Sequence, residues 1–399
     1  MADKLKDSIL KMAAELKQEV ILARRHLHMN PELSFRETET ASYICNYLKN
    51  NDIPFRNNIA GNGIIGEITG AFRGDRIIAL RAEMDALPVN EKNEVSYASK
   101  TPGIMHACGH DAHMAMLLGS ARILSNLRDH LKGKILLIFQ PGEELVPGGA
   151  KLMIESGALD NPRPDIVIAQ HGLPELESGK VGYKAGRYMA SSDEIYITIS
   201  GKGGHAALPG ASTDQIYIAS KLITRLKETI ISLKEEKEVP TVLGIGRIIG
   251  DGATNVIPEK VEIAGTFRTF NEEWRDEAKK LISTIASDTA RQYGVRIDVK
   301  IGHGYPVLVN DESLTARAIR FSEELLGKDK VEMFDIRMSS EDFAFFTEAF
   351  PSLYYRTGIR KKGGPVRNLH TADFDLDEEG LETGVANLTW LAVNFLKET

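Results

Sequence analysis

The spacing of apolar residues divides the chain into segments of different architecture. Residues 5–50 have helical spacing that is interrupted at Asn30 and Pro31. Helical spacing returns after residue 113 and again from Ala150. Short apolar runs bounded by Gly and Asp predict buried strands, which cover residues 64–68, 76–80, 134–139 and 165–169. Because strands and helices alternate, we expect an α/β sheet whose loops carry the chemistry.

The spacing of apolar residues changes near Gly186. From there the pattern predicts in turn a half-buried strand, a helix, two strands, a helix and a strand, over residues 194–200, 213–234, 241–249, 260–270, 272–293 and 295–301. This β-α-β-β-α-β order is typical of a ferredoxin-like α+β unit. The α/β pattern resumes after about residue 304. We therefore expect a domain over 187–303 that is inserted into a larger one formed by 1–186 and 304–399.

Bulk composition narrows the classes of function. The 399 residues exceed what one ordinary hydrophobic core organises, which favours two domains. A formal net charge of −7 argues against general binding of nucleic acid. No apolar run approaches the roughly 18 residues that span a membrane, and residues 1–19 have the pattern of an amphipathic helix. Cys45 lies in an apolar helical pattern, so we expect no disulfide and a cytoplasmic location.

One short stretch concentrates side chains that bind metals. Cys108 and His110 are separated by a single glycine, and a thiolate and an imidazole so spaced can reach one metal ion together. The alternative is a buried cysteine that acts only as a small hydrophobe. His106 and His113 flank the pair, and we expect each to hydrogen-bond or pack beside the site rather than to bind the ion.

Two adjacent carboxylates follow the strand predicted over 134–139. Neighbouring side chains on a regular strand point to opposite faces, so Glu143 and Glu144 cannot be two equivalent ligands there. At a turn, one carboxylate can reach a metal ion while the other removes a proton from water and later protonates a leaving amine. The alternative is a solvated acidic turn, which the preceding Phe139-Gln140-Pro141 does not favour.

Three polar residues elsewhere can converge on the same edge of the sheet. His171 comes after the strand predicted over 165–169, and His370 lies near the end of the chain. A lone histidine, however, more often has a structural role. Asp85 follows the strand predicted over 76–80, where it either orients a ligand imidazole or is an ordinary solvated loop residue.

A series of ordered motifs spans nearly the whole chain. They are Arg24-Arg25-His26-Leu27-His28 with Pro31-Glu32 and Glu37, Met84-Asp85-Ala86-Leu87-Pro88, Cys108-Gly109-His110-Asp111-Ala112-His113, Phe139-Gln140-Pro141 with Glu143-Glu144, Gln170-His171-Gly172, Gly201-Lys202-Gly203-Gly204-His205, Thr254-Asn255-Val256-Ile257-Pro258 and Ser340-Glu341-Asp342-Phe343. The chain thereby resembles the metallopeptidase family of the aminoacylases. Within that family it is similar to the amidohydrolase branch of N-acyl-amino-acid, hippurate and auxin-conjugate hydrolases.

The resemblance implies a zinc-exopeptidase-like, three-layer α/β catalytic domain with an inserted dimerisation or lid domain. It also implies two divalent metal ions per subunit, with the ligands Cys108, His110, Glu144, His171 and His370. Zn, Mn, Co and Ni all suit this mixed set of donors. Glu143 would be the general base and acid, and Asp85 would orient a ligand imidazole.

The resemblance assigns three residues of the insert to the substrate. His205 and Asn255 would polarise the scissile carbonyl or hold the substrate, His205 from the same subunit or from a partner. Arg268 would bind the amino-acid carboxylate through its planar guanidinium. The insert of the family also implies a homodimer.

The resulting hypothesis is hydrolysis of the amide bond in a small N-acyl amino acid, which releases a carboxylic acid and a free amino acid. Metal ions would lower the pKa of bound water toward ~7, and Glu143 would take the proton and then protonate the amine. A dipeptidase or carboxypeptidase of the same family is the alternative enzyme. A non-catalytic metal- or ligand-binding relative is the alternative from another class.

Overall fold

The computed structural model describes residues 2–208, 210 and 212–398, so residues 1 and 399 of the expected domain ranges lie outside the described part. The chain divides into two compact units, each with its own hydrophobic core. Unit 1 contains the residues up to Tyr188, Val309–Asp335 and the residues from Asp342 onward. Unit 2 contains Met189–Leu308 and Ile336–Glu341.

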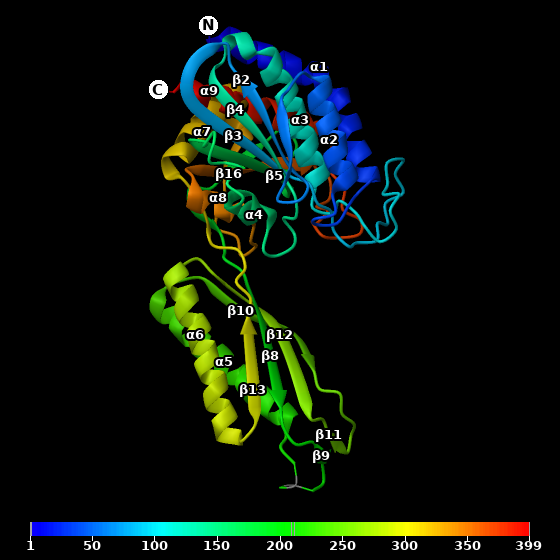
Figure 1. Ribbon diagram of the computed structural model, residues 1–399, viewed down its shortest axis with the longest axis vertical. Helices are drawn as coiled ribbons and strands as arrows, with labels where there is room; N and C mark the ends of the chain where they lie inside the picture. Colours follow the sequence, from blue (N-terminus) through cyan, green and yellow to red (C-terminus); the bar gives the residue numbers. More distant parts are fainter. Residues whose placement is uncertain (1, 209, 211, 399) are drawn as a thin grey trace. The chain divides into compact units, whose positions relative to one another are not determined.

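Unit 1 is built on a mixed sheet. Its described strands are β1 (Phe55–Ile59), β2 (Gly63–Thr69), β3 (Phe72–Glu83), β4 (Lys132–Gln140), β5 (Ile166–Glu177), β6 (Val181–Tyr183), β15 (Val331–Met333) and β16 (Ser352–Arg360). They lie in the order β1-β2-β4-β3-β5-β16-β6-β15 (Figure 1). The central strands β4, β3, β5 and β16 pair in parallel, so their carboxyl ends meet at one edge. The short strands β7 (Gly186–Met189) and β14 (Leu308–Asn310) form a separate pair.

Helices cover both faces of this sheet. They are α1 (Ala2–Met29), α2 (Thr38–Asn50), α3 (His110–Asn126), α4 (Gly149–Glu155), α7 (Glu312–Leu326), α8 (Ala344–Ala349) and α9 (Glu379–Lys397), with 3-10 turns at Arg128–His130 and Lys328–Lys330. Leu80 of β3 points into the core that contains α3 and α9. The next residue, Arg81, points to the other face, where its guanidinium lies 5.7 Å from the ring centre of Phe343, the residue before α8. Unit 1 is therefore a three-layer α/β/α structure.

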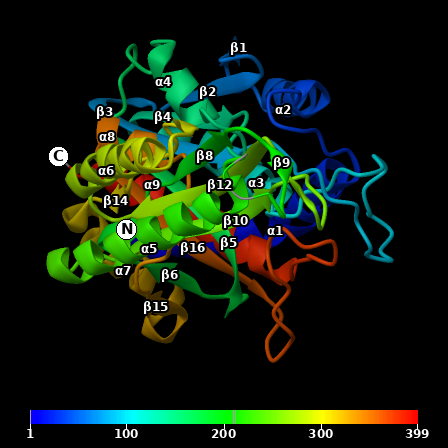
Figure 2. The ribbon, with the colours of Figure 1, turned by 90° about the horizontal axis from the view of Figure 1, so that it is seen from below.

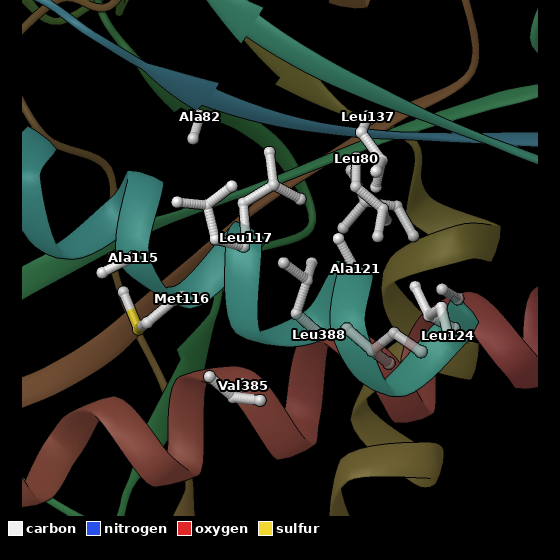
Figure 3. Packing of buried hydrophobic residues seen from close by; sticks show 14 of the residues in the cluster. Leu80, Ala82, Ala115, Met116, Leu117, Ala121, Leu124, Leu137, Val385 and Leu388 are labelled. Atoms are coloured by element: carbon white, nitrogen blue, oxygen red, sulfur yellow. The ribbon is translucent and has the colours of Figure 1, made fainter. Parts of the chain in front are cut away.

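Helices α3 and α9 pack against each other, and both contact the sheet (Figure 3). Leu117 faces Leu80 of the sheet, whereas Val385 of α9 lies on the opposite side of α3, and all three are buried. Gly119 allows α1 and α9 to approach α3 closely. A Cβ at this position would lie 2.7 Å from Val20 Cγ2 and 2.9 Å from Val385 Cγ2, which is too close for either side chain to stay in place.

A buried ion-pair network fixes the start of α3 against α1. Arg24 of α1 donates from Nε to Asp111, in the first turn of α3, at 2.8 Å, and neither side chain has exposed surface. Arg24 Nη2 also donates to Asp375 at 3.0 Å. His28 Nδ1 lies 2.8 Å from the same Asp111 carboxylate. Because buried charges are tolerated only when they are paired, this network holds His110, the first residue of α3, at a fixed place.

Unit 2 has two layers. Its described elements are β8 (Asp193–Ser200), β9 (Gly204–His205), α5 (Gln215–Lys237), β10 (Thr241–Ile249), β11 (Val256–Ile257), β12 (Lys260–Thr269), α6 (Glu272–Tyr293) and β13 (Arg296–Ile301). The four long strands form an antiparallel sheet in the order β10-β12-β8-β13, and β9 pairs with β11. Helices α5 and α6 lie side by side against this sheet (Figures 1 and 2). This arrangement is that of a ferredoxin-like unit.

The predicted fold class is confirmed, but the predicted end of one strand is wrong. The strand predicted over 165–169 continues as β5 to Glu177, because its pairing with β16 extends from Val167 to Glu177. His171 therefore lies inside a strand and not after one. Among the described residues, none of the helices is both long and apolar enough to cross a membrane.

The network around Asp111 predicts a specific dependence of stability on pH. Burial lowers the pKa of His28, but the charge of Asp111 and hydrogen bonds to Asp111 and Glu91 outweigh burial and raise the pKa to about 9. Protonated His28 thus stabilises the fold fully below its unfolded pKa of ~6.5, and this contribution is lost as the pH rises through about 9. The raised pKa corresponds to an effect on the order of 3 kcal/mol.

We expect His28→Gln to remove this dependence, since a glutamine side chain does not titrate. The difference in free energy of unfolding between wild type and variant should shrink between about pH 6.5 and pH 9. Denaturant unfolding at a series of pH values measures it. A difference that stays constant over this range would show that His28 is neutral in the folded protein.

Candidate metal centre

Three side chains from distant parts of unit 1 meet near the carboxyl edge of the parallel strands. Cys108 Sγ lies 3.4 Å from His171 Nε2 and 3.3 Å from His370 Nε2. Cys108 lies in the loop before α3, and Gly109, at a φ of 87°, lets the chain turn from this loop into the helix. His370 lies in the segment between β16 and α9, and its N–H donates to Ala107 O at 2.7 Å. The cysteine loop thus holds the His370 segment in place.

His110 is oriented toward the same centre by Asp85. His110 Nδ1 donates to the Asp85 carbonyl at 2.8 Å and lies 3.4 Å from the Asp85 carboxylate. Its Nε2 is buried and has no hydrogen-bond partner in the described part of the chain. Burial lowers the pKa of His110, but the bond to Asp85 and the charges of Glu83, Asp85 and Glu144 raise it to about 10. These carboxylates favour a cation at Nε2, either a proton or a metal ion in its place.

His171 is the neutral member of the group. Burial, assisted by the charge of Arg356, holds its pKa well below the ordinary value. Its Nδ1 donates to the carbonyl of Gly172 at 2.7 Å, so the lone pair is on Nε2, the atom that faces Cys108. A neutral imidazole with a fixed tautomer is the form that binds metal ions.

The loop after β4 positions the two adjacent glutamates. Glu144 N donates to the Asp85 carboxylate at 2.9 Å, and Glu144 Oε1 lies 3.2 Å from His370 Nε2. Glu143 is buried, and its Oε1 accepts from Asp342 N at 3.4 Å. Both glutamates lie beyond the end of β4 at Gln140, so the alternation of a strand does not force them apart.

The donor atoms fit a divalent transition-metal site. One group whose atoms lie within 4.8 Å of one another contains Cys108, Glu144 and His370, and a second contains His110, Glu143 and Glu144. Glu144 belongs to both groups. Thiolate, imidazole and carboxylate donors together suit ions of the zinc type rather than calcium or magnesium.

The remaining predicted site residues belong to unit 2. His205 in β9 pairs with Val256 of β11, and Ala206 N donates to the O of Asn255, the residue before β11, at 2.9 Å, so His205 and Asn255 lie at the same end of one two-stranded ribbon. Arg268 of β12 donates from Nη1 to Met338 O at 2.9 Å, and burial lowers its pKa.

The sequence pattern did not identify two buried carboxylates beside the centre as site residues. Glu37 accepts from Phe35 N and from Gly142 N, both at 2.8 Å, and so holds the loop of Glu143. Glu83 lies 3.1 Å from His113 Nδ1. The sequence contained a signal for Glu83, because an acidic residue at the end of an apolar strand, two residues before Asp85, lies close to the predicted site.

A three-layer α/β unit with thiolate, imidazole and carboxylate side chains at its carboxyl edge, in one chain with a ferredoxin-like unit, is typical of the class of two-domain metallopeptidases. Residues 79–394 match the family described as peptidase family M20/M25/M40. The chain belongs to this family.

Two relatives are named for the hydrolysis of N-acetyl or N-acyl amino acids. The chain is 42% identical over 341 residues to the N-acetyl-L-cysteine deacetylase of Bacillus subtilis, and the matched region covers 85% of this chain and 80% of the relative. It is 41% identical over 308 residues to an N-acyl-L-amino acid amidohydrolase of Geobacillus stearothermophilus, which covers 77% of this chain and 82% of the relative. The solved YXEP protein of Bacillus subtilis, described as a dinuclear metal binding peptidase from the M20 family, has 32% identity and a TM-score of 0.82, with 97% of this chain and 99% of that chain covered.

The loop that carries Glu143 should tolerate no side chain at Gly142. A Cβ at Gly142 would overlap the ring of Phe35, and Gly142 has a φ of 59°. Gly179 also has a positive φ, 87°, but a Cβ there meets nothing within 4 Å. Gly179→Ala therefore reports the cost of backbone strain alone, and Gly142→Ala adds a clash to it.

We expect Gly142→Ala to lower the free energy of unfolding by about 1–3 kcal/mol more than Gly179→Ala does. Equilibrium unfolding in denaturant measures both values. Equal losses would mean that Phe35 moves away freely and does not fix the loop.

Proposed function

We propose that this protein hydrolyses the amide bond of N-acyl amino acids in a metal-dependent reaction. The observation that carries the proposal is the approach of Cys108 Sγ to His171 and His370, with the unpartnered His110 Nε2 and Glu144 beside them. Membership of the M20/M25/M40 family, with relatives named for N-acetyl and N-acyl amino acids, supports this choice of substrate.

The five side chains Cys108, His110, Glu144, His171 and His370 would hold two divalent ions. Glu144 lies within reach of both Cys108 with His370 and His110 with Glu143, so its carboxylate would be among the ligands. Asp85 would keep the His110 ring in place through its carbonyl and carboxylate. When bound, the ions supply Lewis acidity, which acidifies a water molecule and polarises the scissile carbonyl.

Glu143 would move the protons. Its carboxylate is buried within 4.8 Å of donor atoms of His110 and Glu144. From there it can accept a proton from the attacking water and deliver it to the amine as the C–N bond breaks. Asp342 N, which donates to Glu143 Oε1, keeps the carboxylate in one orientation between the two transfers.

The substrate contacts proposed for unit 2 are hydrogen bonds and one ion pair. His205 and Asn255 would donate to the carbonyl oxygen, where negative charge develops in the transition state. Their place at the same end of the β9–β11 ribbon supports a joint role. Arg268 would bind the carboxylate of the amino acid with the part of its guanidinium that Met338 O does not occupy.

We further propose a cytoplasmic homodimer that forms through unit 2. β10 is an edge strand of the antiparallel sheet, and its exposed side chains include Val242, Ile248 and Ile249. A long apolar edge strand presents unpaired backbone groups that favour pairing with a second copy. Two reduced cysteines, Cys45 and Cys108, are consistent with a reducing compartment.

The test of the reaction is Glu143→Gln, assayed on N-acetyl amino acids, N-benzoyl amino acids and dipeptides. We expect wild type to prefer the N-acyl compounds, and the variant to keep its metal content while kcat falls about 10²–10⁴-fold, because only the proton carrier is lost. Glu155→Gln, on the exposed side of α4, is the matched control and should change neither quantity. Elemental analysis and initial rates supply both measurements.

Each alternative has its own result in this assay. A near-normal rate for Glu143→Gln would remove Glu143 from the reaction. Preference of the wild type for dipeptides would indicate a dipeptidase or carboxypeptidase. Metal-loaded protein that turns over no compound would favour a non-catalytic relative.

The dimer is tested by a charge on the edge strand. We expect the wild type to have about twice the 44.0 kDa mass of one chain and Ile248→Lys to have the mass of a single chain. A lysine that the dimer would bury between its paired strands opposes their pairing. Met333→Lys places the same charge at an exposed apolar residue of β15 in unit 1 and should have no effect. Light scattering after size exclusion distinguishes them. A dimer that survives Ile248→Lys would place its interface elsewhere.

A further inference from the structure

A continuous line of buried charged side chains lies beside the metal centre in unit 1. It consists of Asp342, Arg81, Glu83 and His113, each at most 1% exposed. Arg81 Nη2 donates to Asp342 Oδ1 at 2.7 Å, and another nitrogen of the same guanidinium is paired with Glu83. Glu83 Oε2 in turn lies 3.1 Å from His113 Nδ1. None of these side chains belongs to the proposed ligand set.

The hydrogen bonds of His113 determine its tautomer. Gly172 N, a donor, lies 2.8 Å from His113 Nε2, so this nitrogen must carry the lone pair. The proton is then on Nδ1, where it is donated to Glu83. The imidazole is thus an obligatory bridge between the Glu83 carboxylate and the backbone of β5.

The backbone that His113 holds is the one that orients His171. Gly172 follows His171 directly, and its carbonyl accepts the His171 Nδ1 proton at 2.7 Å. The two imidazole rings are in contact, with centroids 4.4 Å apart. Movement of Gly172 would therefore rotate the ring whose Nε2 faces Cys108.

The other end of the line reaches the proposed proton carrier. Asp342 accepts from Gln140, the last residue of β4, and from Ala150 N in α4 at 3.0 Å. The backbone N of the same Asp342 donates to Glu143 Oε1. The line thus connects the strand of His171 with the loop of Glu143 through side chains that solvent does not reach.

Stability alone is a weak reason for such a line, because removing two carboxylates and a guanidinium from water costs about as much as their attraction returns. A geometric role is the stronger reason, since each member contacts the next through a hydrogen bond or an ion pair. We infer that His113 is a positioning residue for the metal centre, which acts through Gly172 on His171 and is itself fixed by Glu83 and Arg81. The inference rests on the proposed metal site.

The test uses cobalt(II) titrated into metal-free protein, because the Cys108 thiolate gives bound cobalt a charge-transfer absorption that needs no turnover. His113→Phe keeps an aromatic ring and removes both nitrogens. We expect its affinity for cobalt to fall about 10–100-fold, the range seen when partners of metal ligands are removed. Ser120→Ala is the matched control. It removes a buried hydroxyl further along α3 that bonds Met116 O and Val385 O, so it should lower stability and leave the affinity unchanged.

A second variant makes the result independent of the folding of the first. Glu83→Gln keeps the size of the side chain but puts an amide group where Arg81 and His113 both require an acceptor, and we expect the same direction of change. Wild-type affinity in either variant that folds, as judged by circular dichroism, would overturn the inference. If His113→Phe does not fold, Glu83→Gln decides alone.

Failure of the positioning role and failure of the proposed function give different results. Wild-type protein without the thiolate–cobalt band would refute the metal centre itself. A wild type with the band, together with folded variants of equal affinity, would refute only the role of His113.

Discussion

The parallel pairing of β4, β3, β5 and β16 is the constraint on which the site depends. Parallel strands present their carboxyl ends at one edge, so residues far apart in sequence leave the sheet together. Asp85 follows β3, the Glu143–Glu144 pair follows β4, and β5 carries His171. His110 is bound to this edge through the Asp85 carbonyl, and the His370 segment is bound to the cysteine loop through the bond from His370 N to Ala107 O.

Two networks of buried charged side chains position residues at that edge. On the side of α1, Arg24 and His28 hold Asp111 and with it the first turn of α3, which begins at His110. On the other side, Arg81 and Glu83 lead to His113 and the backbone of β5. Both networks exclude solvent, so each keeps its polar partners in one arrangement. Within unit 1 the positions of the proposed ligands therefore depend on buried residues outside the proposed ligand set.

The chemistry of the centre follows from its mixed donors. A thiolate among imidazoles and carboxylates favours zinc-type ions, and the carboxylates around His110 favour positive charge at its free nitrogen. Glu143 lies in the same group of atoms yet is oriented by a backbone donor, Asp342 N. This combination of fixed acceptors and one carboxylate able to carry protons is what hydrolysis of an unactivated amide requires.

The sequence alone predicted the fold class, many of the helices and strands, and a set of candidate site residues. Apolar periodicity is a local property, and thus the helix over 272–293 and the strand over 241–249 match the structure. Only the tertiary structure decided the extent of β5, because its pairing with β16 supplies hydrogen bonds that the apolar run over 165–169 does not reveal. It likewise decided the roles of Glu37, Glu83 and His113. Chain topology decides which distant backbone group a buried polar side chain bonds, and the local sequence pattern does not encode that partner.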